Sequence, residues 1–369
     1  MRGAALLLAV LALSGCGNLG YYWQSVGGQL QIWQREVPIE RILADPAVDE
    51  KTRAQLERAL RIRDYASREL GLPDNRSYRS YADLARPFVV WNVFAAPEFS
   101  IEAKQWCFPF AGCVGYRGYF SEAEASSHAA MLKAEGYDVH VGGVPAYSTL
   151  GWTNWLGGDP LLDTFVNGLE GELAGLLFHE LAHQVVYVDD DTPFNESYAT
   201  AVERRGVQRW LAQPGREAAR QAYAAAEARR RDFRVLARAA RQELEALYRS
   251  EADAARKRAD KEAVLARLRA EHERLKAGPW QGFAGYDGWF ARANNASLAV
   301  QGAYDDLVPA FERIFEEQGR DFARFHAAVR KLAALPRPER RARLLAEPVM
   351  RPAARAPQTR TEGGLPCPT

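Results

Sequence analysis

Residues 178–183 read Phe178-His179-Glu180-Leu181-Ala182-His183, and residues 194–199 follow closely with Phe194-Asn195-Glu196-Ser197-Tyr198-Ala199. On an α-helix, His179 and His183 lie one turn apart on the same face, so both imidazoles can reach one ion. Glu180 lies about 100° round the helix from His179, where it can act as a base without being a ligand. The spacing predicts a buried helix that carries a single catalytic zinc ion, rather than an amphipathic helix with two incidental histidines.

A third ligand is expected on the next helix, because catalytic zinc usually takes three protein ligands. Thr192 and Pro193 are typical of an N-cap followed by proline at the first helical position. Glu196 then falls near the start of that helix, where a short linker returns it to the histidines, and it is the better third ligand. Glu203, two turns later, is a candidate to orient a ligand histidine through its other ring nitrogen, or it is an ordinary solvated glutamate. A different helix register would exchange the roles of the two glutamates.

The segments before this helix predict a small sheet. Residues 88–94 and 138–141 have the composition of strands, and residues 123–135 between them read as a helix that Gly136 closes. An α/β region of this kind precedes the metal helix in zincin-type enzymes, which bind an extended peptide along an edge strand. The expected fold class is α+β and mainly helical, with a zincin-like metallopeptidase core, a small mixed sheet and a long antiparallel helical hairpin.

Residues 217–276 predict that hairpin, since they lack proline and carry leucines at helical spacing. Two antiparallel helices should turn near residues 250–257, after a boundary at Pro214-Gly215. The many arginines of the hairpin are read as solvated helix faces, with contact to anionic membrane headgroups or to a partner protein as the alternative.

Candidate substrate-binding residues are Tyr147, Ser148, Tyr198, Asn294 and Asn295, each with a structural alternative. Tyr147 and Ser148 could form a wall of the cleft or an ordinary strand end. The asparagines follow an aromatic cluster and need hydrogen-bond partners, which could be a substrate backbone or the metal helices. A tyrosine could donate a hydrogen bond to the oxyanion, and the sequence does not choose among Tyr147, Tyr187, Tyr198, Tyr286 and Tyr304. Residues 116–119 could also border the cleft.

The N-terminus indicates export. Met1-Arg2 and the apolar run from Ala4 to Leu13 are typical of a signal peptide, and Leu13-Ser14-Gly15-Cys16 resembles the lipobox of bacterial lipoproteins. That resemblance implies cleavage before Cys16 and acyl chains on this residue, which would anchor the protein to a membrane. The expected location is the cell envelope, at the periplasmic face of the outer membrane. An ordinary signal peptide with a coincidental cysteine is the alternative.

Cys107 and Cys113 bracket a short loop and would form a disulfide in an oxidising compartment. A metal or redox pair is less favoured, because their spacing is not C-x-x-C and they lie far from the histidines in sequence. Cys367 has no evident partner.

Composition limits the remaining possibilities. The chain has 369 residues, of which 47% are hydrophobic, and a formal net charge of +1, which argues against nucleic acid as a partner. Asp45 to Leu70 reads as a helix that stops at Gly71. The predicted organisation is a signal peptide (1–15), an N-terminal helical segment (16–82), a catalytic core (83–213), the hairpin (214–278), a helical segment that returns to the core (279–335) and a disordered tail (336–369).

The chain resembles the bacterial putative aminopeptidase family of zinc metallopeptidase lipoproteins, which carry H-E-L-A-H-Q and F-N-E-S-[FY]-A segments. The resemblance extends to Gly20-Tyr21-Tyr22-Trp23-Gln24, Trp106-Cys107-Phe108-Pro109, Tyr116-Arg117-Gly118-Tyr119-Phe120, Ala146-Tyr147-Ser148-Thr149-Leu150-Gly151 and Asn294-Asn295-Ala296. It implies zinc at His179, His183 and Glu196, with Glu180 as the catalytic base. The expected function is therefore hydrolysis of a peptide or protein substrate by a membrane-tethered enzyme. The alternatives are a zinc endopeptidase that acts on envelope proteins and a non-catalytic zinc-containing binding protein.

Overall fold

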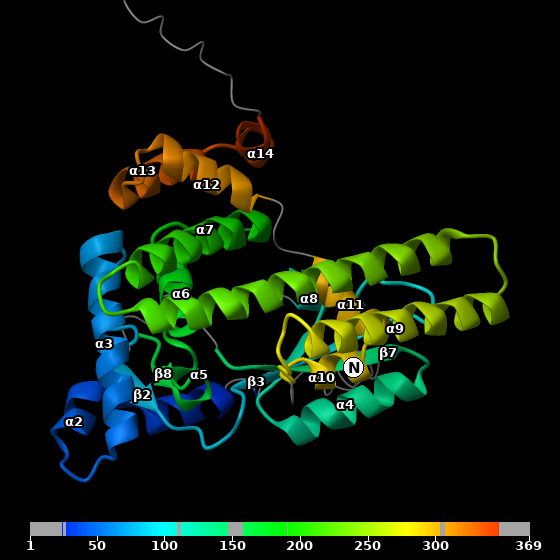
Figure 1. Ribbon diagram of the computed structural model, residues 1–369, viewed down its shortest axis with the longest axis horizontal. Coiled ribbons are helices and arrows are strands. Elements are labelled where there is room, and N and C mark those ends of the chain that lie inside the picture. Colours follow the sequence, from blue (N-terminus) through cyan, green and yellow to red (C-terminus); the bar gives the residue numbers. More distant parts are fainter. Residues whose placement is uncertain are drawn as a thin grey trace, which may run out of the picture.

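The computed structural model describes residues 24, 27–108, 112–146, 158–189, 191–302 and 307–346 of the chain. Helices dominate these residues, and three small sheets lie among them (Figure 1). One group of helices gathers around α3, α6 and α7, and a second group joins a sheet to a long helical hairpin. This arrangement confirms the predicted α+β class with mostly helical content.

The helices begin with an unlabelled one at residues 27–35 and continue as α2 Ile39–Ala44, α3 Glu50–Leu70, α4 Glu122–Ala134, α5 Asp163–Val166, α6 Glu170–His183, α7 Thr192–Leu211, α8 Glu217–Arg249, α9 Ala254–Ala277, α10 Asp287–Ala291, α11 Asn295–Ala299, the 3₁₀ helix η1 Val300–Gly302, α12 Val308–Glu317, α13 Phe322–Ala333 and α14 Arg337–Leu345. The strands are β1 Val37–Pro38, β2 Ser80–Ala82, β3 Val90–Ala96, β4 Trp106–Phe108, β5 Gly112–Val114, β6 Arg117–Tyr119, β7 Asp138–Val144 and β8 Leu161–Leu162.

Helix α3 shows how local signals set the limits of an element. It begins at Glu50 rather than at Asp45, because the Asp49 side chain accepts a hydrogen bond from the Thr52 amide. It ends at the predicted stop, where Gly71 takes a left-handed conformation with φ of 62°. Its buried face packs in the same core as α6 and α7.

The main sheet has the order β6-β3-β7, and both pairs are antiparallel. Helix α4 covers one face of this sheet, where its Ala125, Ala129 and Leu132 pack with Trp91 and Val93 of β3. These elements confirm the predicted strand–helix–strand order of residues 88–141. A second sheet, β1-β2-β8, pairs β2 in parallel with β8 and antiparallel with β1, so it is mixed.

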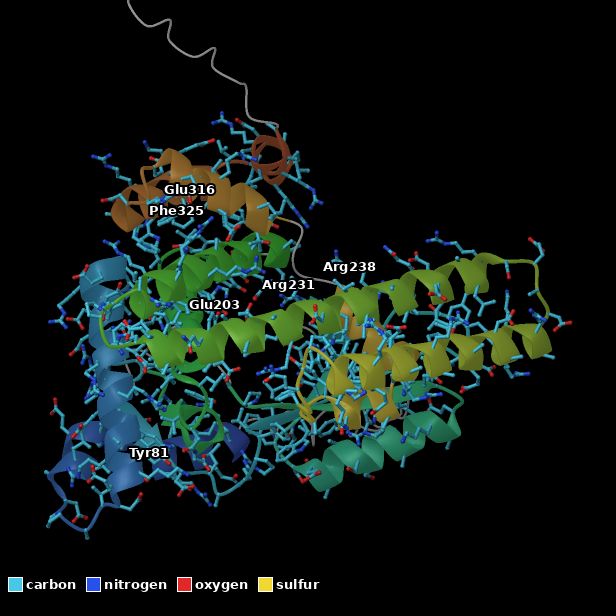
Figure 2. All side chains as sticks on the ribbon, viewed as in Figure 1. Tyr81, Glu203, Arg231, Arg238, Glu316 and Phe325 are labelled. Carbon is cyan, nitrogen blue, oxygen red and sulfur yellow. A yellow bond between two sulfur atoms is a disulfide. The ribbon has the colours of Figure 1, made fainter. Side chains whose placement is uncertain are left out.

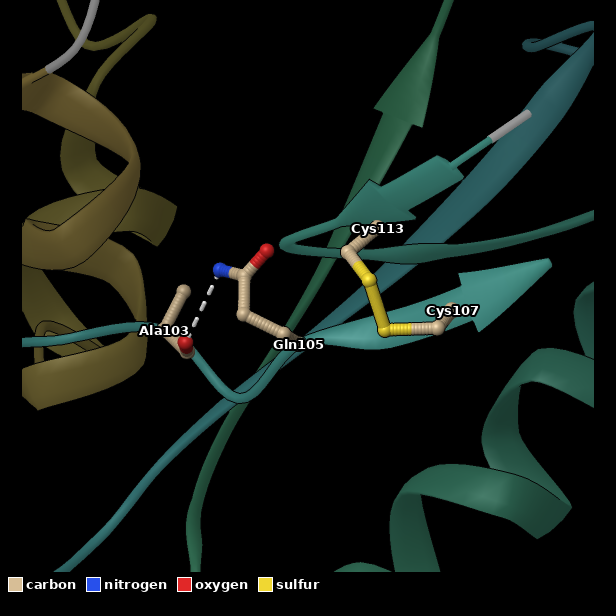
Figure 3. Close-up of a disulfide and its surroundings, with 4 residues drawn as sticks. All are labelled: Ala103, Gln105, Cys107 and Cys113. Carbon is tan, nitrogen blue, oxygen red and sulfur yellow. Dashed lines mark hydrogen bonds between the residues drawn. A yellow bond between two sulfur atoms is a disulfide. The ribbon is translucent and has the colours of Figure 1, made fainter.

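A disulfide joins Cys107 of β4 to Cys113 of β5, as the sequence predicts (Figure 3). The two cysteines face each other in the antiparallel pair. Nearby, the Gln105 side chain donates a hydrogen bond to the Ala103 carbonyl over 3.1 Å.

The hairpin of α8 and α9 confirms the prediction for residues 217–276, and its turn falls within the expected range (Figure 1). Leu244 of α8 and Leu265 and Leu268 of α9 are buried between the two helices and the aromatic side chains of residues 280–290. No helix among the described residues is both long enough and apolar enough to cross a membrane.

The asparagine pair joins the hairpin to the sheet. The Asn295 side chain is fully buried and donates to the carbonyls of Pro97 and Glu98 over 3.0 Å and 2.8 Å. It also accepts a hydrogen bond from the Tyr248 hydroxyl of α8 over 2.7 Å. Asn294 caps α11 and donates to the Val139 carbonyl of β7 over 2.9 Å. These contacts use the amide of Asn295 to join the hairpin to the segment after β3, and the amide of Asn294 to cap α11 and bind β7. They give no support to the prediction that Asn294 and Asn295 bind substrate.

The tail prediction is also wrong for its first part. Residues 337–345 form α14, whose Arg340 is buried and makes two hydrogen bonds to the Asp191 carboxylate, at 2.6 Å and 3.0 Å. Arg340 also donates to the carbonyls of Ala333 and Leu335. These contacts hold α14 against the turn that precedes α7. Residues 347–369 lie outside the described part of the chain.

Candidate metal centre

Helix α6 presents its histidines on one side and its apolar residues on the other. Leu173, Leu177 and Leu181 recur at helical spacing and are completely buried in the largest core. His183 is 4% exposed, and its ring centroid lies 4.9 Å from that of His179. The two imidazoles therefore face the same space, as the one-turn spacing predicts.

The turn between α6 and α7 brings the second motif back to the first. The Asn195 side chain donates to the Val188 carbonyl over 2.8 Å and accepts from the Val188 amide over 2.9 Å. This double contact closes the turn beside Glu196. Helix α7 begins at Thr192 and its N-cap position is Asp191, one residue earlier than predicted. The Asp191 side chain makes no capping hydrogen bond and accepts one from Arg340 instead.

Three donors converge at the centre of this arrangement. The Glu196 carboxylate lies 3.3 Å from Nε2 of His179 and 3.7 Å from Nε2 of His183. One ligand atom from each of the three residues lies within 4.8 Å of the other two. The residues that the sequence predicts as ligands are therefore brought together.

Glu203 contacts the opposite side of the His179 ring. Its Oε2 lies 3.1 Å from Nδ1 of His179, so Glu196 and Glu203 contact different nitrogens of one imidazole. A Cβ at Gly175 would lie 3.2 Å from the Glu203 carboxylate, so the missing side chain at that position lets α7 approach closely. This geometry favours Glu196 over Glu203 as the third donor.

The charges of the cluster fit a cation. Burial disfavours protonation of His179, but its hydrogen bonds to Glu196 and Glu203 outweigh burial and raise its pKa to about 10. The two carboxylates therefore stabilise a positive charge at this ring, which a bound cation would supply in place of the second ring proton. Burial and the neighbouring charge of His179 lower the pKa of His183 to about 4, so this imidazole is neutral and its lone pair is free to coordinate. Two imidazoles and a carboxylate are a donor set that zinc accepts. The residues present therefore fit a zinc ion.

Glu180 lies beside these donors. It follows His179 on α6, is partly buried, and its negative charge contributes to the raised pKa of His179. The predicted base and the predicted ligands thus share one site.

Two expected contributors do not reach this site. Tyr198 is fully buried, and its hydroxyl lies 2.8 Å from Nδ1 of His326. His326 Nε2 lies 2.8 Å from the Leu70 carbonyl, which can only accept, so Nε2 carries the proton and Nδ1 accepts from Tyr198. The prediction that Tyr198 binds substrate is wrong, because this buried chain holds α7 against α13. Tyr286 packs against Phe233 of α8 and against Trp280, which follows α9. Tyr147, Ser148, Tyr304 and Cys16 lie outside the described residues.

One tyrosine near the site was not singled out by the sequence. Burial raises the pKa of the Tyr116 hydroxyl, and the Glu196 carboxylate adds to this effect. Tyr116 is 39% exposed and packs against Phe94 of β3 with ring centroids 5.7 Å apart. Tyr187, the other candidate, is 47% exposed with its ring centroid 6.2 Å from that of His183. The only sequence signal for Tyr116 was its place in the segment 116–119 expected to border the cleft.

The fold and the site define a class: a mainly helical α+β protein with two histidines on one helix and a glutamate on the next. The family described as "Putative aminopeptidase" matches residues 20–344, and the chain belongs to this family. Comparison with curated proteins and with solved structures found no match.

Proposed function

We propose that the protein is a zinc-dependent peptide hydrolase, an aminopeptidase, with a zincin-like core built on α6 and α7. The observation that carries the proposal is the convergence of His179, His183 and Glu196 within 4.8 Å, with Glu180 next to His179 on the same helix. The family to which the chain belongs supports the peptidase activity. One zinc ion would be held by the two Nε2 atoms and the Glu196 carboxylate.

When bound, zinc would supply Lewis acidity toward the substrate carbonyl and the attacking water. Glu180 would take the proton from the water and return it to the leaving amine, since a carboxylate beside the metal can act as both base and acid. Glu203 would hold the His179 ring with Nε2 toward the metal, by accepting a hydrogen bond from Nδ1. The Tyr116 hydroxyl, whose pKa the nearby Glu196 carboxylate helps to raise, would donate to the developing oxyanion.

Removal and return of the metal test this proposal. Protein purified with its metal should contain one zinc per chain, lose peptide hydrolysis on dialysis against a chelator, and regain it when zinc is added. Hydrolysis that survives complete loss of zinc would contradict the proposal. A comparison of free with N-acetylated peptides then separates an aminopeptidase from an endopeptidase. Loss of turnover on acetylation indicates that the enzyme recognises the substrate amine.

We also propose that the protein is a lipoprotein of the cell envelope, acylated at Cys16. The support is the lipobox-like Leu13-Ser14-Gly15-Cys16 after an apolar run, together with the Cys107–Cys113 disulfide, which suits an oxidising compartment. Cells fed a labelled fatty acid should incorporate label into the wild-type protein and not into Cys16→Ser. Equal labelling of both proteins would exclude acylation at this residue.

A further inference from the structure

Most basic side chains on the outer faces of the hairpin have an acidic partner. Among the described residues, seven arginines of α8 and α9 form ion pairs with carboxylates: Arg230 with Glu172 and Glu227, Arg249 with Glu245, Arg256 with Asp260, Arg258 with Glu98, Arg267 with Glu243, Arg269 with Glu262, and Arg274 with Glu271. These pairs neutralise the hairpin locally. These ion pairs agree with the prediction that the arginines of the hairpin lie on solvated helix faces.

One stretch of α8 departs from this pattern. Arg231, Arg234 and Arg238 lie on one face of the helix and make no ion pair with any described residue. They line a shallow hollow of about 350 Å³ together with Val235, Ala239 and Gln242, so no carboxylate lines it among the described residues. Figure 2 shows Arg231 and Arg238 two turns apart along α8. We call these six residues the α8 basic face.

The centre of the α8 basic face is apolar and exposed. Val235 is 61% exposed, more than any other large hydrophobic side chain among the described residues. Arg231, Arg234 and Arg238 stand four residues before it, one before it and three after it, so cationic groups surround it on the helix surface. Val235 is not among the side chains packed in the core of the hairpin, so it is available to contact another surface.

We propose that the α8 basic face docks on a membrane surface that carries anionic phospholipid headgroups. Guanidinium groups bind phosphate oxygens in a bidentate manner, and the hollow between the arginines can admit a headgroup phosphate. Val235 and the arginine stems can then enter the interfacial region, as the apolar strip of an interfacial helix does. A single straight helix face suits a planar surface better than it suits an acidic peptide, which would need a groove.

Vesicle binding tests this proposal on the chain from residue 17 to residue 369. This chain contains every described residue and lacks the predicted signal peptide and the lipidated cysteine, so its binding reports the folded surface. The probes are vesicles of phosphatidylcholine alone and of phosphatidylcholine mixed with phosphatidylglycerol. The protein should bind the mixed vesicles, should bind the neutral vesicles far less, and should lose binding as salt is added.

The variant with Arg231→Gln, Arg234→Gln and Arg238→Gln should bind the mixed vesicles about a hundredfold more weakly, because each basic residue near an anionic surface contributes roughly a fivefold factor. Its control carries Arg249→Gln, Arg256→Gln and Arg274→Gln, which remove the same charge from paired positions. The control should retain most of the binding. Val235→Ser should weaken binding while the charge is unchanged.

Equal losses in the two triple variants would overturn the proposal, because binding would then follow net charge alone. Absence of binding to mixed vesicles would overturn it too. If the wild-type chain ignores vesicles but binds polyglutamate through the α8 basic face, the surface serves an acidic protein instead. Hydrolysis of a soluble peptide should be equal in all these proteins, so the test is independent of the proposed peptidase activity.

Discussion

Nδ1 of His179 lies 3.1 Å from the carboxylate of Glu203, on the side of the imidazole that faces away from His183 and Glu196. Glu203 thereby fixes which nitrogen of His179 faces the other two donors, His183 and Glu196. Glu203→Gln should weaken zinc affinity about 10- to 100-fold, the usual effect of losing a partner that orients a ligand histidine. Competition with a chelator measures this, and Glu245→Gln on α8 is the control. Equal zinc affinity in Glu203→Gln and the wild type would show that the contact is not needed for binding.

Tyr116→Phe should lower kcat for peptide hydrolysis about a hundredfold with little change in KM, because an oxyanion donor acts mainly in the transition state. Tyr187→Phe is the matched comparison, since its ring also approaches the metal cluster, from the His183 side. Steady-state kinetics on one peptide decide between the two tyrosines. A kcat that falls only in Tyr187→Phe would transfer the role to that residue.

The buried pair of Arg340 and Asp191 should contribute strongly to stability. Arg340→Met should lower the free energy of unfolding by about 3–5 kcal/mol, because it leaves the buried Asp191 carboxylate with only the half-exposed Arg337, whose Nε lies 4.0 Å away. The double variant Arg340→Met with Asp191→Leu should recover part of this loss. Urea unfolding measures both. A loss below about 1 kcal/mol in the single variant would mean that α14 does not anchor the turn before α7.

His140 should make stability depend on pH. Burial, with a smaller contribution from the charge of Arg292, lowers its pKa from 6.5 to about 4 in the folded protein. Between these two values the unfolded chain binds a proton at His140 and the folded chain does not, so the free energy of unfolding decreases as the pH falls. The thermal midpoint of the wild type should therefore drop more between pH 7 and pH 4 than that of His140→Gln. Parallel drops in the two proteins would show that this imidazole is not responsible.

The sequence predicted best those features that depend on local spacing. His179 and His183 are four residues apart on one helix, and Glu196 follows after a turn that Asn195 closes by binding Val188, so nearby residues suffice to define the cluster. The hairpin was predicted equally well, because its apolar residues recur at the helical period and no proline interrupts them.

Features that depend on distant partners were missed. Arg340 lies in an arginine-rich segment that the sequence predicts to be disordered, and its partner Asp191 is 149 residues away in the chain. Tyr198 lies beside a predicted ligand, yet its hydroxyl binds His326, 128 residues away. Asn295 contacts Pro97 and Glu98, nearly 200 residues before it, so nothing near it in sequence indicates which groups it binds.

In the proposed mechanism, Glu180 acts as the base of a zinc peptide hydrolase whose ligands are His179, His183 and Glu196. The most direct measurement compares zinc content and peptide turnover of Glu180→Gln with those of the wild type. Both proteins should contain one zinc per chain, and turnover should fall by several orders of magnitude in Glu180→Gln. Equal turnover in Glu180→Gln with zinc retained would contradict this mechanism.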